Sequence, residues 1–176
     1  MRLFVARHGE TLWNAENRIC GLTDIDLTEK GLRQAGKLSE DKRIGDVDII
    51  ISSPLKRAVA TANTARGTRD IPVIIDNRLI EQNYGIYEGA DRKTPRFLEN
   101  KGNFAFKYPG GESMLQLGQR VYNLLDELKE KYSDKTVLLV CHGGVARMIR
   151  TYFEDMTNRE FVSYSPENCS ISEYTL

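Results

Sequence analysis

Nine residues near the start of the chain, Leu3–Thr11 with the sequence LFVARHGET, join four apolar residues directly to an arginine, a histidine and a glycine. A continuous apolar run is typical of a central strand covered on both faces, and a glycine allows a sharp turn where such a strand ends. In open α/β sheets, ligands bind at the carboxyl ends of the strands. We therefore interpret this stretch as a buried strand that delivers His8 as a candidate nucleophile.

A second apolar run ends in the other of the chain's two histidines. Val137–Cys141 leads directly into His142, which two glycines follow. If both runs are parallel strands of one sheet, their carboxyl ends share an edge, and His8 and His142 meet in one crevice. The alternative is two structural histidines. Arg7 favours a functional site, because charge at the end of a buried strand is costly without an anionic partner.

Length and composition restrict the class of protein. The 176 residues fit one domain, 1–176, and the balance of 25 basic against 25 acidic residues argues against a nucleic-acid or anionic-membrane surface. No apolar run approaches the roughly 20 residues that span a bilayer, and no cleavage signature follows Met1, so we expect a cytoplasmic protein. The cysteines are scattered and carboxylates do not cluster with the histidines, so we expect neither disulfides nor a metal or other cofactor.

Hydrophobic patterning predicts alternating strands and helices. The expected strands are 3–6, 47–51, 72–76, 136–141 and, at an edge, 170–174. The expected helices begin near Thr28, Ser53, Ser113 and Val145. This order predicts a three-layer α/β/α sandwich with a mostly parallel central sheet and right-handed crossovers.

Charged residues follow two further strands. Ser53 is expected to cap a helix with Pro54 at its first position, so that backbone amides and Arg57 can face the crevice and bind a phosphate. The alternative for Arg57 is a solvated helix arginine. After the third strand, Glu81 and Glu88 lie in a glycine-punctuated loop, and spacing alone does not show which is the functional carboxylate.

The segment 90–108 has no clear periodicity and alternates basic with aromatic residues. We expect a partly helical flap that recognises the substrate, although an incidental solvated insertion fits the same composition. Its basic residues are Arg92, Lys93, Arg96, Lys101 and Lys107. Nothing in this segment specifies a ligand, so the physiological substrate stays open.

Two histidines, two arginines, helix-start amides and a carboxylate are the parts that phosphoryl transfer needs. Arginine forks and backbone amides can neutralise the equatorial oxygens of a transferring phosphoryl group without a metal ion. Imidazole can attack phosphorus to form a phosphohistidine, which divides one difficult displacement into two easier ones. The residues therefore favour phosphoryl transfer through a histidine.

The sequence Arg7-His8-Gly9-Glu10-Thr11 resembles the signature of the histidine phosphatase superfamily, which includes the phosphoglycerate mutases. Further landmarks of that superfamily occur in order along nearly the whole chain. They are Gly21 with Asp24 and Leu27, 53–58 (SPLKRA), Glu81 with Tyr84-Gly85, 111–113 (GES) and 142–144 (HGG). One such motif is weak evidence, whereas the ordered set is highly specific.

The resemblance implies a phosphoglycerate mutase-like fold and a role for each candidate residue. His8 is implied to be the nucleophile, and Glu81 the acid that protonates the leaving oxygen, which leaves Glu88 a structural role. The residues implied to hold the phosphoryl oxygens are Arg7, Arg57 and His142. Those implied to complete the phosphate pocket or to lie near the substrate are Asn14, the amide of Gly143, Thr11, Gly21 and Tyr84.

Phosphatases and mutases of this superfamily differ in what attacks the phosphohistidine. Water gives hydrolysis, and a second hydroxyl gives isomerisation. The resemblance implies that the mutases are longer chains, with an Arg-His pair directly after the acid glutamate. This chain has Gln82-Asn83 at that position. That departure and the short flap favour a metal-independent phosphatase of small phosphomonoesters, with a phosphoglycerate mutase-type isomerase as the alternative. The oligomeric state stays open.

Two other hypotheses remain. Cys141–Arg147 fits the C-x-x-G-x-x-R pattern of cysteine-dependent tyrosine phosphatases, in which helix amides activate a thiolate. However, Met148 stands where that family usually has a hydroxyl residue, and the Arg7-His8-Gly9 sequence stays unexplained. The other hypothesis is a non-catalytic phosphate-binding module, against which the complete set of candidate residues argues, because degenerate relatives usually lose one.

Overall fold

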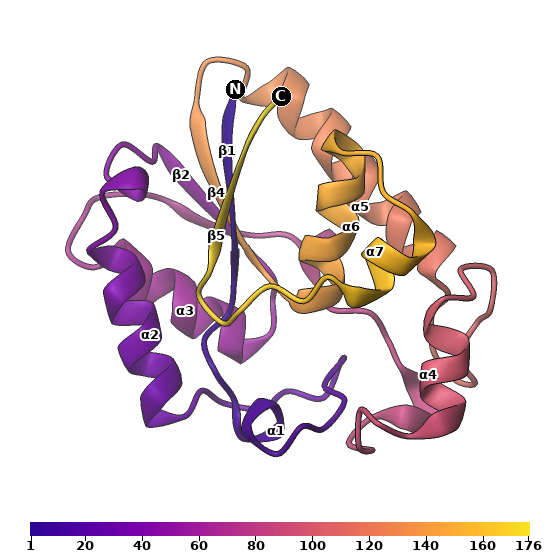
Figure 1. Ribbon diagram of the computed structural model, residues 1–176. Helices are drawn as coiled ribbons and strands as arrows, with labels where there is room; N and C mark the ends of the chain where they lie inside the picture. Colours follow the sequence, from indigo (N-terminus) through magenta and orange to yellow (C-terminus); the bar gives the residue numbers. More distant parts are fainter.

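The computed structural model describes residues 1–176 and contains a five-stranded sheet in the order β3-β2-β4-β1-β5. The strands are β1 (Arg2–Arg7), β2 (Ile49–Ser52), β3 (Val73–Ile75), β4 (Thr136–Cys141) and β5 (Ile171–Thr175). The first four strands are parallel, and β5 pairs with β1 in the antiparallel direction at one edge (Figure 1). The predicted mostly parallel sheet and the edge strand near residue 170 are confirmed.

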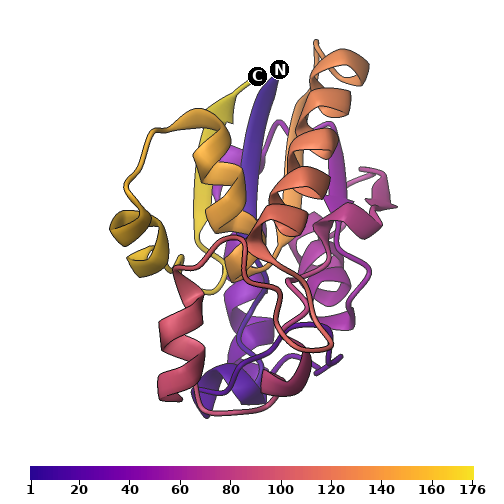
Figure 2. The same cartoon turned by 90° about the vertical axis from the view of Figure 1, so that its right-hand side faces the viewer.

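Helices cover both faces of the sheet, which gives the predicted three-layer α/β/α sandwich (Figures 1 and 2). One face carries α2 (Glu29–Ser39) and α3 (Lys56–Arg66), and the other carries α5 (Met114–Lys131) and α6 (Gly143–Phe153). The shorter helices are α1 (Leu12–Ala15), α4 (Pro95–Lys101), α7 (Asn158–Ser163) and the 3-10 turns Lys42–Ile44, Asn77–Leu79 and Gly85–Tyr87.

Both faces of the central strands are buried, which explains their unbroken apolar sequence. Leu3 and Val5 of β1 pack in the core that α5 and α6 cover. Phe4 and Ala6 pack in the core that α2 and α3 cover. Burying a Leu, Val or Phe side chain contributes roughly 1.5–3 kcal/mol. The uninterrupted apolar run was therefore a direct sign of a covered strand.

Helix starts were predicted correctly where the cap is local. Thr28 accepts a hydrogen bond from the amide of Gly31 at the start of α2, and Ser113 forms the predicted capping box of α5 with Gln116. The predicted start of α3 at Ser53 is wrong, because the amide of Ser53 still donates to the carbonyl of Val140 in the sheet, at 3.0 Å. The helix begins at Lys56.

The pairing of β1 with β4 brings two distant segments together at one edge of the sheet. Arg7 is in register with Cys141, and the amide of His8 donates to the Cys141 carbonyl at 2.9 Å. His8 and His142 therefore both leave the sheet at the carboxyl ends of adjacent parallel strands. None of the helices combines the length and the apolar composition that crossing a bilayer requires.

The segment 90–108 is partly helical, as predicted, and contains α4. Its Phe97 and Tyr108 pack with Ile19 and Tyr87 in a small buried cluster that is separate from the two main cores. This aromatic cluster fixes the segment over the sheet edge. Aromatic packing, together with one short helix, therefore holds the segment in place.

Candidate active site

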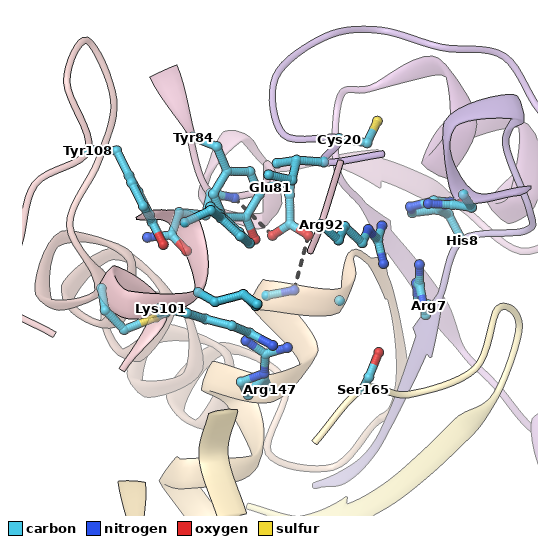
Figure 3. A pocket seen from close by; sticks show the side chains of 18 residues that line it. Arg7, His8, Cys20, Glu81, Tyr84, Arg92, Lys101, Tyr108, Arg147 and Ser165 are labelled. Atoms are coloured by element: carbon cyan, nitrogen blue, oxygen red, sulfur yellow. Dashed lines mark hydrogen bonds between the residues drawn. The ribbon is translucent and has the colours of Figure 1, made fainter. Parts of the chain in front are cut away.

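His8 presents one ring nitrogen to a cavity at the sheet edge. Its Nδ1 lies 2.7 Å from the carbonyl oxygen of Gly9, and a carbonyl can only accept, so Nδ1 carries the proton. The other nitrogen, Nε2, forms no hydrogen bond to the protein, and His8 lines the cavity (Figure 3). Asn168 holds the backbone of the same residue by donating to the His8 carbonyl at 2.8 Å.

His142 lies beside His8, with their ring centroids 5.0 Å apart. The predicted meeting of the two histidines is confirmed. Arg57 donates its Nε hydrogen to Nδ1 of His142 at 3.3 Å, so Nδ1 is the acceptor and Nε2 carries the proton. That Nε2 lies 2.7 Å from Oγ of Ser53. Hydrogen bonds to Arg57 and Ser53 therefore fix the tautomer and the orientation of His142.

Burial keeps both imidazoles neutral. Removal from water lowers the pKa of His8 well below its ordinary value, and the charges of Arg57 and Arg7 lower it further. The pKa of His142 is lowered in the same direction, first by burial and then by Arg57. A neutral imidazole has a free electron pair, which is the form that can attack phosphorus.

Arg7 brings a positive charge with an unused donor to the cavity. Its Nη1 donates to the carbonyl of Pro166 at 2.7 Å, but its buried Nε has no hydrogen-bond partner. Burial lowers the pKa of Arg7 to about 10, so the group stays charged at neutral pH. A buried guanidinium with an unsatisfied N–H group fits an anion.

Arg57 is fully buried, so the alternative of a solvated helix arginine is wrong. Besides His142, its fork donates to the carbonyls of Gly21 and Thr23, at 2.6 and 2.8 Å. These contacts place Arg57 behind His142 and not on the wall of the cavity.

Two backbone N–H groups hold the carboxylate of Glu81. Its Oε1 accepts from Gln82 at 2.8 Å, and its Oε2 accepts from Gly144 at 3.0 Å, in the first turn of α6 (Figure 3). A helix N-terminus favours a negative group at this position. Glu81 lines the same cavity as His8, with Tyr84 beside it.

Glu88 serves the structure of a neighbouring loop, as the resemblance implied. Its carboxylate accepts from the amides of Gly21, Leu22 and Thr23, at 3.1 to 3.3 Å, and from the Thr23 hydroxyl at 2.8 Å. The same loop supplies the carbonyls that bind Arg57. Glu88 thereby supports the guanidinium from which His142 receives its hydrogen bond.

The predicted site residues divide into three groups. Those that line the cavity are Arg7, His8, Asn14, Glu81, Tyr84 and Gly143. Arg57 and His142 lie directly behind that wall. Thr11 is buried and caps α1, and the backbone of Gly21 binds Glu88 and Arg57, so both act on the loops around the site.

Cys141 does not reach the cavity. Its side chain is fully buried in the core that α5 and α6 cover, and its Sγ lies 3.8 Å from the carbonyl of His142. Burial raises the pKa of this thiol far above its ordinary value, which disfavours the thiolate. This geometry argues against a cysteine-dependent mechanism.

Sequence reasoning missed three contributors to the site. Arg147 lines the cavity, and its place one helical turn after Gly143 was a usable signal, because residues four apart share a helix face. Asn168 and Ser165 come from the segment before β5, and Ser165 lines the cavity while Asn168 binds the backbone of His8. Nothing in the local sequence marks either residue.

The layered sheet and the two neutral imidazoles at adjacent strand ends define the class of protein, an α/β protein of the histidine phosphatase fold. The chain belongs to the histidine phosphatase superfamily, branch 1, whose sequence profile matches residues 3–176. The predicted family is thereby confirmed, and members of this superfamily transfer phosphoryl groups.

The proteins similar to this chain include both phosphatases and a probable mutase. The chain is 32% identical to phosphoserine phosphatase 1 of Hydrogenobacter thermophilus, over 98% of this chain and 85% of that protein. It is 38% identical to the probable phosphoglycerate mutase GpmB of Yersinia pestis, over 81% of this chain and 70% of that protein. A solved structure of mycobacterial glucosyl-3-phosphoglycerate phosphatase with VO3 superposes with a TM-score of 0.85 at 28% identity, covering 98% of this chain and 91% of that one.

Proposed function

We propose that this protein is a metal-independent phosphatase that hydrolyses phosphomonoesters of small metabolites through a phosphohistidine on His8. The observation that carries the proposal is the orientation of His8. Its Nδ1 hydrogen is committed to the Gly9 carbonyl, which leaves Nε2 without a partner, and the cavity that His8 lines is also lined by Arg7, whose buried Nε–H is unused. A candidate nucleophile and a candidate oxyanion donor in one cavity support phosphoryl transfer there.

In the first step, the Nε2 electron pair of His8 attacks phosphorus, and the bond from phosphorus to the ester oxygen breaks. Arg7 and the amide of Gly143 bind the equatorial oxygens, and the positive charge of Arg57 acts from behind the neutral His142. Glu81 gives a proton to the leaving oxygen, which departs as an alcohol. The products are that alcohol and a phosphorylated His8.

In the second step, water attacks phosphorus and the bond from phosphorus to nitrogen breaks. Glu81, now a carboxylate, accepts the proton of the attacking water, and inorganic phosphate is released. His8 recovers its electron pair and Glu81 its proton. The two backbone N–H groups that hold Glu81 keep it in one orientation for both transfers.

The two residues directly after Glu81 favour hydrolysis over isomerisation. Gln82 is buried and donates to the carbonyl of Glu112, and the amide of Asn83 lies 3.4 Å from the carboxylate of the same residue. These two residues are therefore used in holding a loop, and neither supplies the positive charge with which a mutase would retain a phosphorylated product. Relatives with phosphatase and with mutase names both occur, so the experiment must measure both reactions.

The test is a panel of metabolite phosphates incubated with purified protein in EDTA, with free phosphate and isomerised product measured together. We expect phosphate release that EDTA leaves unchanged. A phosphoenzyme that is labile in acid and stable in alkali should form during turnover and be absent from the His8→Asn variant. Interconversion of 3- and 2-phosphoglycerate that is faster than phosphate release would instead identify a mutase.

A further inference from the structure

Three basic side chains from separate parts of the chain converge beside the proposed reaction centre. Arg92 precedes α4, Lys101 is the last residue of α4, and Arg147 belongs to α6. All three line the cavity that holds His8 and Glu81. Figure 3 shows Arg92 extended toward His8, and Lys101 with Arg147 farther along the cavity.

None of these three cations has an acidic partner. All the ion pairs of the protein involve other side chains. Each of the three donates one hydrogen bond to a backbone carbonyl instead, at 3.0 Å from Nε of Arg92, 2.8 Å from Nζ of Lys101 and 2.9 Å from Nε of Arg147. The terminal nitrogens of both guanidinium groups therefore keep their hydrogens for a ligand.

The three charges repel one another in a partly desolvated space. Burial, Arg147 and Arg92 together lower the pKa of Lys101 to about 8. Like charges are brought together at a cost, which an anion between them removes. Glu81 lines the same cavity but forms no ion pair with any of the three, and the donors to its two oxygens are backbone amides.

We propose that Arg92, Lys101 and Arg147 form a second anion subsite, which binds an acidic group on the leaving portion of the substrate while the phosphoryl group lies at His8. This inference rests on the proposed function and narrows its substrate class. The substrates are phosphomonoesters that carry a second acid, a carboxylate or another phosphate. The cavity that would hold the phosphoryl group and this second acid has a volume of about 110 Å³.

The guanidinium groups of Arg92 and Arg147 are suited to this task, because one nitrogen anchors each group to the backbone and the other two can bind an anion. With Nε of Arg92 and of Arg147 fixed on a carbonyl, the two terminal groups are presented in a set direction. Such a planar fork matches the geometry of carboxylate and phosphate oxygens. Lys101 adds a point charge that adjusts to either.

The experiment compares three phosphate esters that share the same three-carbon chain. They are 3-hydroxypropyl phosphate, 3-phosphooxypropanoate and propane-1,3-diol bisphosphate, whose far ends are a hydroxyl, a carboxylate and a phosphate. None can be isomerised into another. We expect kcat/KM to be at least tenfold higher for one or both acidic compounds, mostly through a lower KM, and the two acidic compounds separate carboxylate from phosphate recognition.

The variants Arg92→Gln and Lys101→Met should each reduce that preference by about tenfold. Matched controls come from the same segment, because Arg96 and Lys107 are exposed and do not line the cavity. Arg96→Gln and Lys107→Met should keep the preference of the wild-type protein. Equal kcat/KM for all three compounds would overturn the proposed subsite. So would a loss of the preference in the control variants that equals the loss in Arg92→Gln and Lys101→Met.

Binding to the His8→Asn variant separates this inference from the proposed function. Calorimetric titration with the same three compounds gives dissociation constants without turnover. A tenfold tighter binding of an acidic compound that Lys101→Met removes supports the subsite, even if the wild-type protein releases no phosphate. Absence of turnover by wild type would refute the phosphatase alone, whereas equal dissociation constants would refute the subsite alone.

Discussion

At the scale of single residues, the chemistry depends on the state of two buried imidazoles. The sequence was sufficient to predict that His8 and His142 meet, because each comes directly after an apolar run that is typical of a covered parallel strand. It could not predict their tautomers, which depend on Gly9, Ser53 and Arg57. Only the first of these partners is local in sequence.

Replacement of the nucleophile should separate the histidine and cysteine mechanisms. His8→Asn removes the attacking electron pair, and we expect kcat to fall by at least about 10³-fold. Cys141→Ser removes a buried thiol that does not reach the cavity, so it should lower stability but keep kcat within about threefold. The reverse pattern in steady-state rates on the preferred phosphate would refute the proposed roles.

Loss of the Ser53 hydroxyl should affect catalysis through His142. Ser53→Ala leaves the Nε2 hydrogen of a fully buried imidazole without its acceptor, which costs about 1–3 kcal/mol of stability and loosens the ring. We expect kcat to fall by about tenfold. Ser52→Ala is the matched control, since Ser52 is equally buried but its hydroxyl contacts the Ser53 carbonyl. Similar kcat values for the two variants would contradict a positioning role.

The lowered pKa of His8 predicts how stability changes with pH. Below its ordinary pKa near 6.5, the unfolded chain binds a proton at this residue that the folded protein does not bind. The wild-type free energy of unfolding should therefore decrease as pH falls from 6.5 to 5, with a slope of about 1.4 kcal/mol per pH unit from this residue. In urea denaturation, His8→Asn should lose this contribution, so its stability relative to wild type rises on acidification. Parallel plots of unfolding free energy against pH for the two proteins would contradict a lowered pKa of His8 in the folded protein.

At the scale of helices and strands, prediction succeeded where the determining contacts are local or periodic. The apolar stripe of α5 and the caps of α2 and α5 were read directly from spacing. The start of α3 was misplaced because Ser53 is used in the sheet and by His142, both distant in sequence. The segment 90–108 had no readable period, because tertiary aromatic packing fixes it.

Two glycines of α2 should respond in opposite ways to alanine. Gly36 has open space where a Cβ would lie, so Gly36→Ala should stabilise the protein by about 0.5–1 kcal/mol. Gly31 lies against the backbone of Glu10, where a Cβ would clash with the carbonyl. Gly31→Ala should therefore destabilise the protein and disturb the segment after His8. Thermal denaturation of the two variants measures the contrast, and equal shifts would show that this contact is unimportant.

At the scale of the whole molecule, strand order gathers the site from the full length of the chain. The loop after β1, the loop that holds Glu81, the start of α6 and the segment before β5 all meet at one edge of the sheet. The contribution of the segment before β5 could not be predicted from the sequence. Pro166 and Asn168 reach Arg7 and His8 only because β5 pairs with β1 in the antiparallel direction. The roles expected for the individual site residues came from the resemblance to the superfamily, because no local sequence pattern specifies them.

The first and last residues are hydrogen-bonded to each other, from the Met1 amino group to the Leu176 carbonyl at 2.9 Å, at the end of β1 remote from His8 (Figure 1). A short flexible linker could therefore join them without bending either strand. New ends opened at the exposed turn beside Gly67, between α3 and β3, would leave the cavity untouched. Such a circular permutant should fold and retain phosphate release within about threefold of the wild-type rate, which a phosphate assay would measure.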